Sequence, residues 1–173
     1  MCELGDDWVM HVERVGAERH VYPTPHWEAE QAIALHLMSA AHAPPPSAGW
    51  LPDEAACRQA LDAWNDNHDD DRKVDALQKE AVCEAMERPV TVVTGSPGTG
   101  KTRTTSVIVD LLVAAGYDVL IGCLTGKAAQ RFQSMLGADA RARIMFGGAT
   151  TIHKIVATKT AINSRRMALV IDE

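Results

Sequence analysis

The sequence predicts an α/β fold built around a parallel sheet, and three observations support this. The segment Gly95-Ser96-Pro97-Gly98-Thr99-Gly100-Lys101-Thr102 fits the phosphate-binding pattern G-x-x-x-x-G-K-[ST]. An apolar, β-branched run at 90–94 precedes it and a helical pattern at 103–115 follows it. From residue 75 onward, strand patterns alternate with helix patterns, an order typical of a parallel sheet covered by helices.

The first part of the chain predicts a small α+β segment of hairpin and helix. Two runs around Gly16, at 8–14 and 19–22, are predicted to pair as a β-hairpin. A proline near its start opens a predicted helix over 25–41. Residues 43–49 are rich in Ala and Pro and cannot continue a helix, so they predict a linker.

Two further helices are predicted before the glycine-rich segment. One covers 52–64 and ends in the acidic run at 66–71, and the next is capped by Asp75 and reaches about Glu87. We therefore expect three regions: a hairpin-and-helix segment at 1–46, a linker with its helix at 47–73, and an α/β nucleotide-binding domain at 74–173.

The rest of the third region completes the α/β pattern. Gly116 and Gly137 are placed to end helices. The predicted elements are a strand at 118–123, a helix at 126–136, a short helix from Thr150 or Thr151 to Val156, and a strand at 168–171. Because parallel strands present their carboxyl ends at one edge, we expect the glycine-rich loop, Thr125 and the Asp172-Glu173 pair to lie there.

Composition restricts the class of protein. The four cysteines form no C-x-x-C pair and no apolar run approaches the length of a membrane helix. We therefore expect reduced thiols, a cytoplasmic location and no membrane partner. The net charge is −6, but residues 1–75 carry 15 Asp and Glu against 5 Lys and Arg, whereas residues 76–173 carry 8 against 12.

The basic residues of the second half are concentrated in one segment. Residues 127–166 contain a single acid, Asp139, and eight bases: Lys127, Arg131, Arg141, Arg143, Lys154, Lys159, Arg165 and Arg166. Such a run is either a solvated surface or a track for a polyanion, and the adjacent nucleotide site favours the track. Its aromatic residues, which could stack on bases, are Phe132 and Phe146.

The glycine-rich loop predicts an ATP and Mg²⁺ site. Backbone N–H groups of the loop and of the following helix would bind phosphate oxygens, Lys101 would reach the β- and γ-phosphates, and the Thr102 hydroxyl would bind Mg²⁺. The predicted nucleotide contacts are Gln78, Gly95, Ser96, Pro97, Gly98, Thr99, Gly100, Lys101, Thr102 and Arg103. Asp172 would hold the metal, and Glu173 would orient or deprotonate the attacking water.

Gln78 completes an ordered series of motifs. It precedes the glycine-rich loop, and the segments Thr125-Gly126-Lys127-Ala128-Ala129, Thr151-Ile152-His153 and Val170-Ile171-Asp172-Glu173 follow. Over roughly residues 74–173, this series resembles RecD-like superfamily 1 DNA helicases. The resemblance implies an incomplete RecA-like P-loop NTPase domain, in which Gln78 contacts adenine and Asp172 and Glu173 drive hydrolysis, with Lys101 and Glu173 as the catalytic residues.

The resemblance also implies a nucleic-acid partner. It assigns contacts with single-stranded DNA to Thr125, Gly126 and Lys127, and to His153, while Arg131 adds charge on the same predicted helix. Leu124 stands where the family usually has Pro. The family has a second RecA-like domain, which supplies an arginine finger and which this sequence does not include, so we expect no unwinding by this polypeptide alone.

The predicted function is therefore the ATP-binding part of an ATP-dependent DNA helicase, a class associated with DNA repair and recombination. Two alternatives remain open at this stage. An AAA-type ATPase shares the glycine-rich loop and a strand ending in Asp-Glu, although Gln78 and the T-G-K-A-A segment argue against it. A non-catalytic nucleotide- or nucleic-acid-binding module is the other.

Overall fold

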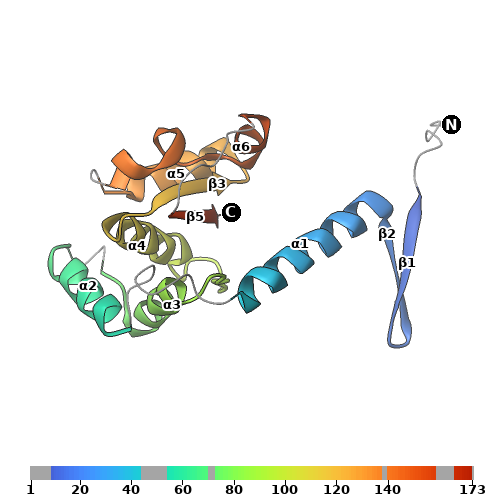
Figure 1. Ribbon diagram of the computed structural model, residues 1–173, viewed down its shortest axis with the longest axis horizontal. Helices are drawn as coiled ribbons and strands as arrows, with labels where there is room; N and C mark the ends of the chain where they lie inside the picture. Colours follow the sequence, from blue (N-terminus) through green and yellow to red (C-terminus); the bar gives the residue numbers. More distant parts are fainter. Residues whose placement is uncertain (1–8, 44–53, 70–72, 138–139, 159–165, 173) are drawn as a thin grey trace. The chain divides into compact units, whose positions relative to one another are not determined.

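The computed structural model describes residues 9–43, 54–69, 73–137, 140–158 and 166–172 (Figure 1). The chain forms two compact units, Met1–Pro44 and Pro45–Glu173. The predicted linker at 43–49 lies outside the described residues apart from Ala43, and Glu173 also lies outside them.

The first unit is a hairpin followed by a long helix, as predicted. Strands β1 (Met10–Val15) and β2 (Glu18–Pro23) pair antiparallel, and Gly16 lies in the turn with a φ of 63°. Helix α1 (Thr24–His42) has a proline in its first turn. The Trp27 indole of α1 stacks on the His11 imidazole of β1, with ring centroids 3.7 Å apart. This stack and the Thr24 hydroxyl, which donates to the Val9 carbonyl (2.6 Å), join helix and hairpin.

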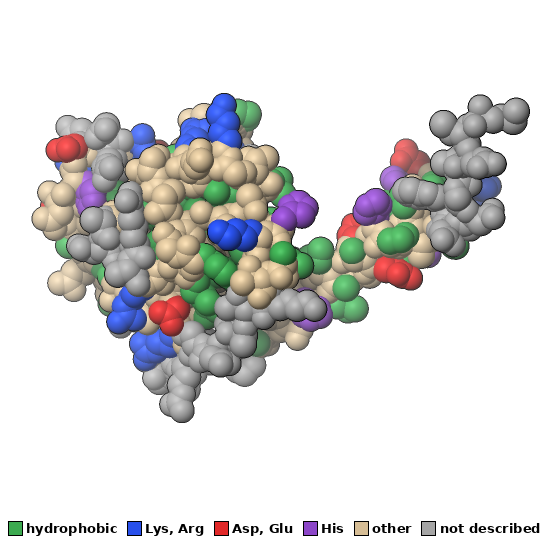
Figure 2. Space-filling model, turned by 90° about the horizontal axis from the view of Figure 1, so that it is seen from above, with side chains coloured by type: hydrophobic (Ala, Val, Ile, Leu, Met, Phe, Trp, Pro, Cys, Tyr) green, Lys and Arg blue, Asp and Glu red, His purple; other side chains and the backbone are tan. Residues whose placement is uncertain are grey.

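No described side chain of α1 is buried. Its exposed apolar residues include Ile33, Leu35, Leu37 and Met38, and Figure 2 shows hydrophobic side chains at the surface of this unit. The hairpin strands β1 and β2 therefore cover little of the apolar surface of α1.

The second unit begins with two helices that pack on each other, α2 (Glu54–Asp66) and α3 (Ala76–Glu87). A capping box starts α3 and confirms the predicted Asp75 cap. The Asp75 carboxylate accepts from the Gln78 backbone N–H (2.9 Å), and the Gln78 side-chain oxygen accepts from the Asp75 N–H (3.0 Å). Between the helices, the Cys57 and Cys83 thiols are hydrogen-bonded, and burial raises the pKa of Cys57 to about 12, so this thiol is not ionised at neutral pH.

A three-stranded parallel sheet forms the centre of this unit, in the order β4-β3-β5. Strands β3 (Asp118–Cys123) and β5 (Met167–Asp172) pair over their full length, and β4 (Thr150–Thr151) is a short edge strand. The helices are α4 (Lys101–Ala114), α5 (Gly126–Met135) and α6 (Ile152–Thr158), and the short 3-10 turns are η1 (Ala140–Arg143) and η2 (Met145–Gly147). The helices and strands predicted from 103 onward are thus confirmed with small differences in their ends, except that Thr150 and Thr151, predicted to begin a helix, form strand β4.

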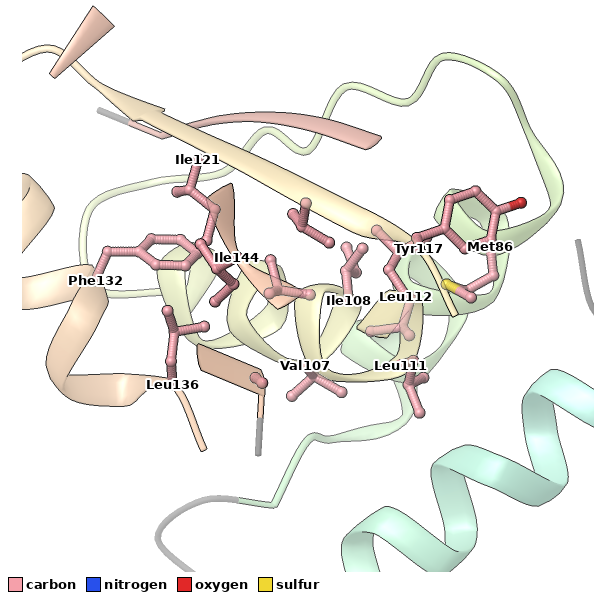
Figure 3. Packing of buried hydrophobic residues seen from close by; sticks show 14 of the residues in the cluster. Met86, Val107, Ile108, Leu111, Leu112, Tyr117, Ile121, Phe132, Leu136 and Ile144 are labelled. Carbon is pink, nitrogen blue, oxygen red and sulfur yellow. The ribbon is translucent and has the colours of Figure 1, made fainter. Parts of the chain in front are cut away.

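Alternate residues of β3 face opposite sides of the sheet. Ile121 points into a core built with α4 and α5, where Val107 and Phe132 are fully buried (Figure 3). Gly122 faces the other side, and a Cβ atom there would lie 3.1 Å from the side chains of Ile152, Ile155 and Ile171. Helix α6 therefore approaches β3 closely on the face opposite α4 because position 122 has no side chain.

The strand predicted at 90–94 is wrong. Residues 91–96 form no strand, and Val92 is 75% exposed. In the described part of the chain, no strand pairs with β5 on the side opposite β3, and Leu169 and Ile171 of β5 are 59% and 55% exposed. A parallel strand needs a neighbour to accept and donate its backbone hydrogen bonds, and 90–94 has none here.

We predict that this edge of β5 makes the 173-residue chain self-associate. Ile171→Lys should shift the protein toward monomer in analytical ultracentrifugation and lower the binding of an apolar-surface dye, because a charge on an edge strand opposes edge-to-edge pairing. Val156→Lys, which makes the same change at an exposed apolar site on α6, is the control. If both variants shift the protein toward monomer equally, the added charge explains the effect and the β5 edge is not the site of self-association.

Candidate nucleotide site and nucleic-acid interface

The glycine-rich loop leads directly into α4. Gly98 and Gly100 each have a φ of 82°, a left-handed conformation that residues with side chains rarely adopt, and Gly100 is the N-cap of α4. The first N–H groups of a helix have no partner within the helix, and its N-terminus carries partial positive charge. The loop therefore ends at a group of donors suited to an anion.

Lys101 lies over the loop. Its ammonium donates to the carbonyl oxygens of Gly95 (2.8 Å) and Ser96 (3.3 Å), and the Thr99 hydroxyl also donates to the Ser96 carbonyl (2.8 Å). Residues 95–99 are all exposed. The ammonium has three N–H donors, so these contacts keep the charge at the loop and allow it to turn toward a bound phosphate.

Gln78 lies against the same loop. In addition to its capping bond to Asp75, its side-chain NH₂ donates to the Thr99 carbonyl (3.1 Å). A Cβ atom at Gly100 would lie 2.6 Å from this nitrogen. Since an amide has two donors and two acceptor lone pairs, one donor and one acceptor position remain for a ligand. The contact between Gln78 and the loop backbone was not expected from the sequence.

Two further contacts join α4 to the preceding helices. The Arg103 guanidinium, exposed on the first turn of α4, donates to the Lys73 carbonyl at 3.5 Å, just before α3. The Trp64 indole N–H of α2 donates to the Asp110 carboxylate of α4 (3.3 Å), and the His68 ring stacks on Trp64 with centroids 3.8 Å apart. Sequence reasoning missed the Trp64–Asp110 bond, because residues 46 positions apart give no local signal.

Asp172 lies at the end of the sheet where α4 starts. It ends β5 opposite Cys123, the last residue of β3. Tyr117, just before β3, donates its N–H to the Leu112 carbonyl, so α4 ends where β3 begins and runs back along the sheet. The start of α4, with Lys101 and Thr102, therefore points to the same edge as Asp172. Burial and the Asp172 charge both raise the pKa of the Cys123 thiol.

The residues predicted to contact DNA follow β3 and β4 at this edge. The Thr125 hydroxyl caps α5 by accepting from the Ala128 N–H (3.1 Å), and Gly126, Lys127 and Arg131 are exposed. Thr151 pairs opposite Cys123, and His153 is exposed on the first turn of α6. Figure 2 shows Lys and Arg side chains at the surface of this unit.

Phe132 cannot serve as a base-stacking platform, in contrast to the prediction. It lies on the inner face of α5 and is fully buried in the core. Phe146, the other candidate, is 36% exposed.

Comparisons with known proteins give the family. Residues 78–173 match the AAA domain family, and the chain belongs to it. The ATP-dependent RecD2 DNA helicase of Deinococcus radiodurans is 37% identical over 65 residues, which are 38% of this chain and 8% of that protein. The chain thus spans a small part of the length of this relative.

These matches confirm the resemblance to RecD-like helicases that the motifs predict. The parallel sheet with α4 on one face and α6 on the other is a partial RecA-like P-loop domain. Among the described residues, no helix is long and apolar enough to cross a membrane, and no group of three or more His, Cys, Asp or Glu residues is arranged to hold a metal ion.

We predict that Gly100→Ala destabilises the protein through two separable effects. The positive φ costs about 1–2 kcal/mol for any residue with a side chain, and the new methyl group meets the Gln78 amide. In thermal unfolding, the cost of Gly100→Ala should be smaller in a Gln78→Ala background, which removes the second effect. The same cost in both backgrounds would show that the loop moves away from Gln78.

Proposed function

We propose that this chain is the ATP-binding part of a DNA helicase that couples hydrolysis to movement on single-stranded DNA. The observation that carries the proposal is the left-handed Gly100 turn, which brings the Lys101 ammonium and the start of α4 to the sheet edge where β5 ends in Asp172. The donors of the loop suit phosphate, and the hydroxyl and carboxylate oxygens of Thr102 and Asp172 suit Mg²⁺.

In this proposal, each residue of the loop has a defined task. Lys101 gives up its bonds to the Gly95 and Ser96 carbonyls and donates to the β- and γ-phosphates of ATP. Thr102 and Asp172 would hold Mg²⁺, which neutralises charge on the phosphates when bound. Glu173 orients or deprotonates the attacking water, a role suited to a carboxylate beside the metal.

Gln78 selects the base. The donor and acceptor positions that remain on its amide match adenine, which offers an acceptor ring nitrogen and a donor amino group. Because the same amide donates to the Thr99 carbonyl, adenine binding and loop position are connected through one side chain. Arg103, on the first turn of α4 beside the Lys73 carbonyl, is a further proposed contact with the nucleotide.

Single-stranded DNA would bind across the starts of α5 and α6. The backbone N–H of Gly126, in the first turn of α5, and the charges of Lys127 and Arg131 suit backbone phosphates, and His153 can bond to phosphate or stack on a base. The cytoplasm is the proposed location, because the proposed function requires DNA and ATP and both are available there.

We expect hydrolysis by this polypeptide alone to be slow and unwinding to be absent. The family that the motifs resemble supplies an arginine finger from a second RecA-like domain, and such groups contribute about 10³–10⁵ in rate in related phosphoryl transfers. The exposed apolar edge of β5 supports the proposal that further structure packs there in the intact protein. A nucleotide-binding module without turnover is the second candidate, because the exposed loop at 95–99 can bind phosphate whether or not hydrolysis follows.

ATPase assays with and without single-stranded DNA separate these candidates. Stimulation of hydrolysis by the DNA supports the helicase, and hydrolysis that does not respond to DNA supports an AAA-type ATPase of another kind. Binding of ATP without turnover, even after a second RecA-like domain of a related helicase is added, supports the module.

We predict that Lys101→Ala weakens Mg²⁺-ATP binding by at least about tenfold in calorimetric titration. The substitution removes a charge-assisted donor to the phosphates, while the fold loses only bonds to two exposed loop carbonyls. Arg58→Ala, which removes an exposed cation paired with Glu54 on α2, is the control and should leave the affinity unchanged. Equal affinities of the wild type and Lys101→Ala would exclude this loop as the phosphate site.

We predict that binding to single-stranded DNA depends steeply on salt and that Lys127 and Arg131 contribute to the dependence. Replacing both with Ala should reduce the slope of log affinity against log salt by about 0.7 for each phosphate that is no longer neutralised. Replacing Arg14 and Arg19 of the hairpin, two exposed cations outside the basic segment, gives the same charge change as a control. If the two double variants have the same slope, the DNA track lies elsewhere.

A further inference from the structure

Phe146 has an unusual backbone conformation. Among the residues that the structure describes, it alone combines a side chain with a positive φ, at φ 61° and ψ 12°. Glycine follows at 147 and 148, with φ values of 74° and 146°. Glycine adopts such angles without strain, whereas phenylalanine does not. Backbone strain of this kind clusters at functional sites, so it motivates a search for a role of the Phe146 side chain.

The loop that carries Phe146 is fixed at both ends. Ile144 bridges to Val119 of β3, and Thr150 pairs with Gly122 further along the same strand. Residues 145–149 therefore leave the edge of β3 and return to it. The Ala149 N–H donates to the Gln133 side-chain oxygen of α5 (2.8 Å), which holds the loop against that helix.

This loop connects the two elements of the proposed DNA track. It is bonded to α5 at Gln133, near the C-terminal end of that helix, and it continues through β4 directly into α6, where His153 lies. A single strand that contacts His153 therefore lies at the start of the helix that continues from the Phe146 loop through β4.

The Phe146 ring is more exposed than any other described aromatic side chain of the second unit. Phe132 and Tyr117 are buried, and Trp64 is half-buried with its indole N–H bonded to Asp110. Phe146 is 36% exposed, so the residue is partly covered by the protein and partly open to solvent. A ring held in this way can stack on a flat ligand at little cost in side-chain entropy.

The charge around the loop indicates the kind of ligand. Arg143, just before the loop, is exposed and donates to the Gly116 carbonyl (3.2 Å), and Lys154 is exposed on α6, which follows the loop through β4. The whole segment from 127 to 166 has eight basic residues and one acid. An aromatic platform among basic side chains suits a single-stranded nucleic acid, which offers flat bases on a chain of phosphates.

We propose that Phe146 is a stacking platform for a base of single-stranded DNA, held on the loop between α5 and β4. This inference rests on the proposed DNA-binding function and adds a specific contact to it. Base stacking on an aromatic side chain accounts for roughly tenfold in affinity per base.

The test compares oligo(dT) with an oligonucleotide of the same length in which abasic sites replace all of the bases. Both strands carry the same phosphates, so the ratio of their affinities reports stacking and not charge. Fluorescence anisotropy with the 173-residue chain should show that the wild type prefers oligo(dT). Phe146→Leu should lose about tenfold in affinity for oligo(dT) and little in affinity for the abasic strand. Phe146→Trp should retain the preference. Val156→Ala, at an exposed apolar residue of α6 in the same basic segment, should retain it also.

The possible outcomes are distinct. If the wild type and Phe146→Leu prefer oligo(dT) equally, Phe146 is not the platform, although the DNA track stands. If the wild type binds neither strand, both the DNA track and the platform are excluded. A folding control tests the backbone: Phe146→Gly should melt at a higher temperature than Phe146→Ala, since glycine accepts the positive φ. Equal melting temperatures would show that this turn is not held and would also overturn the inference.

Discussion

The packing of α4 against β3 and β5 is the interaction on which the rest of the second unit depends. Val107 and Val109 of α4 are fully buried, as are Val119 and Ile121 of β3. Because α4 runs back along the sheet, this apolar contact brings its first turn to the edge where both strands end. The polar residues of the site contribute little to this placement, and they lie together as a consequence of apolar burial.

The N-terminal end of α4 is held from a second direction by α2 and α3. The Gln78 amide bonds to the loop, and the Trp64 indole bonds to Asp110 further along α4. The Gln78 bond from α3 lies just before the first turn of α4, and the Trp64 bond from α2 lies further along α4. Rotation of α4 about its axis would break at least one of them, so the helix that carries Lys101 has a defined orientation before any ligand binds.

The parts of this fold that follow from local sequence could be predicted, and those that depend on distant partners could not. Strand β3 was predicted with the bounds that the structure has, because a buried apolar run between two glycine-containing turns has a local signal. The Asp75 cap was equally local. The 90–94 run has the same composition as a strand, but strand formation requires a neighbour, which composition does not report.

The candidate site divides in the same way. The glycine-rich loop and the position of Asp172 at the end of a strand are readable from motif and pattern. The second bond of Gln78 joins residues 21 positions apart, and its acceptor is a backbone carbonyl that any residue would offer. The sequence does not distinguish Phe132 from Phe146, because only tertiary packing places Phe132 in the core and Phe146 at the surface. The two glycines after Phe146 were the signal for an unusual turn.

The absence of a side chain at Gly122 has a consequence for how a movement of β5 could affect α6. A Cβ atom at Gly122 would lie 3.1 Å from the side chains of Ile152, Ile155 and Ile171. Side chains of α6 and β5 therefore both pack over this one residue of β3. Ile171 is adjacent in sequence to the Asp172 carboxylate, and Ile152 is adjacent to His153. A displacement of β5 beside Asp172 would therefore alter the space above Gly122 into which the isoleucines of α6 also reach.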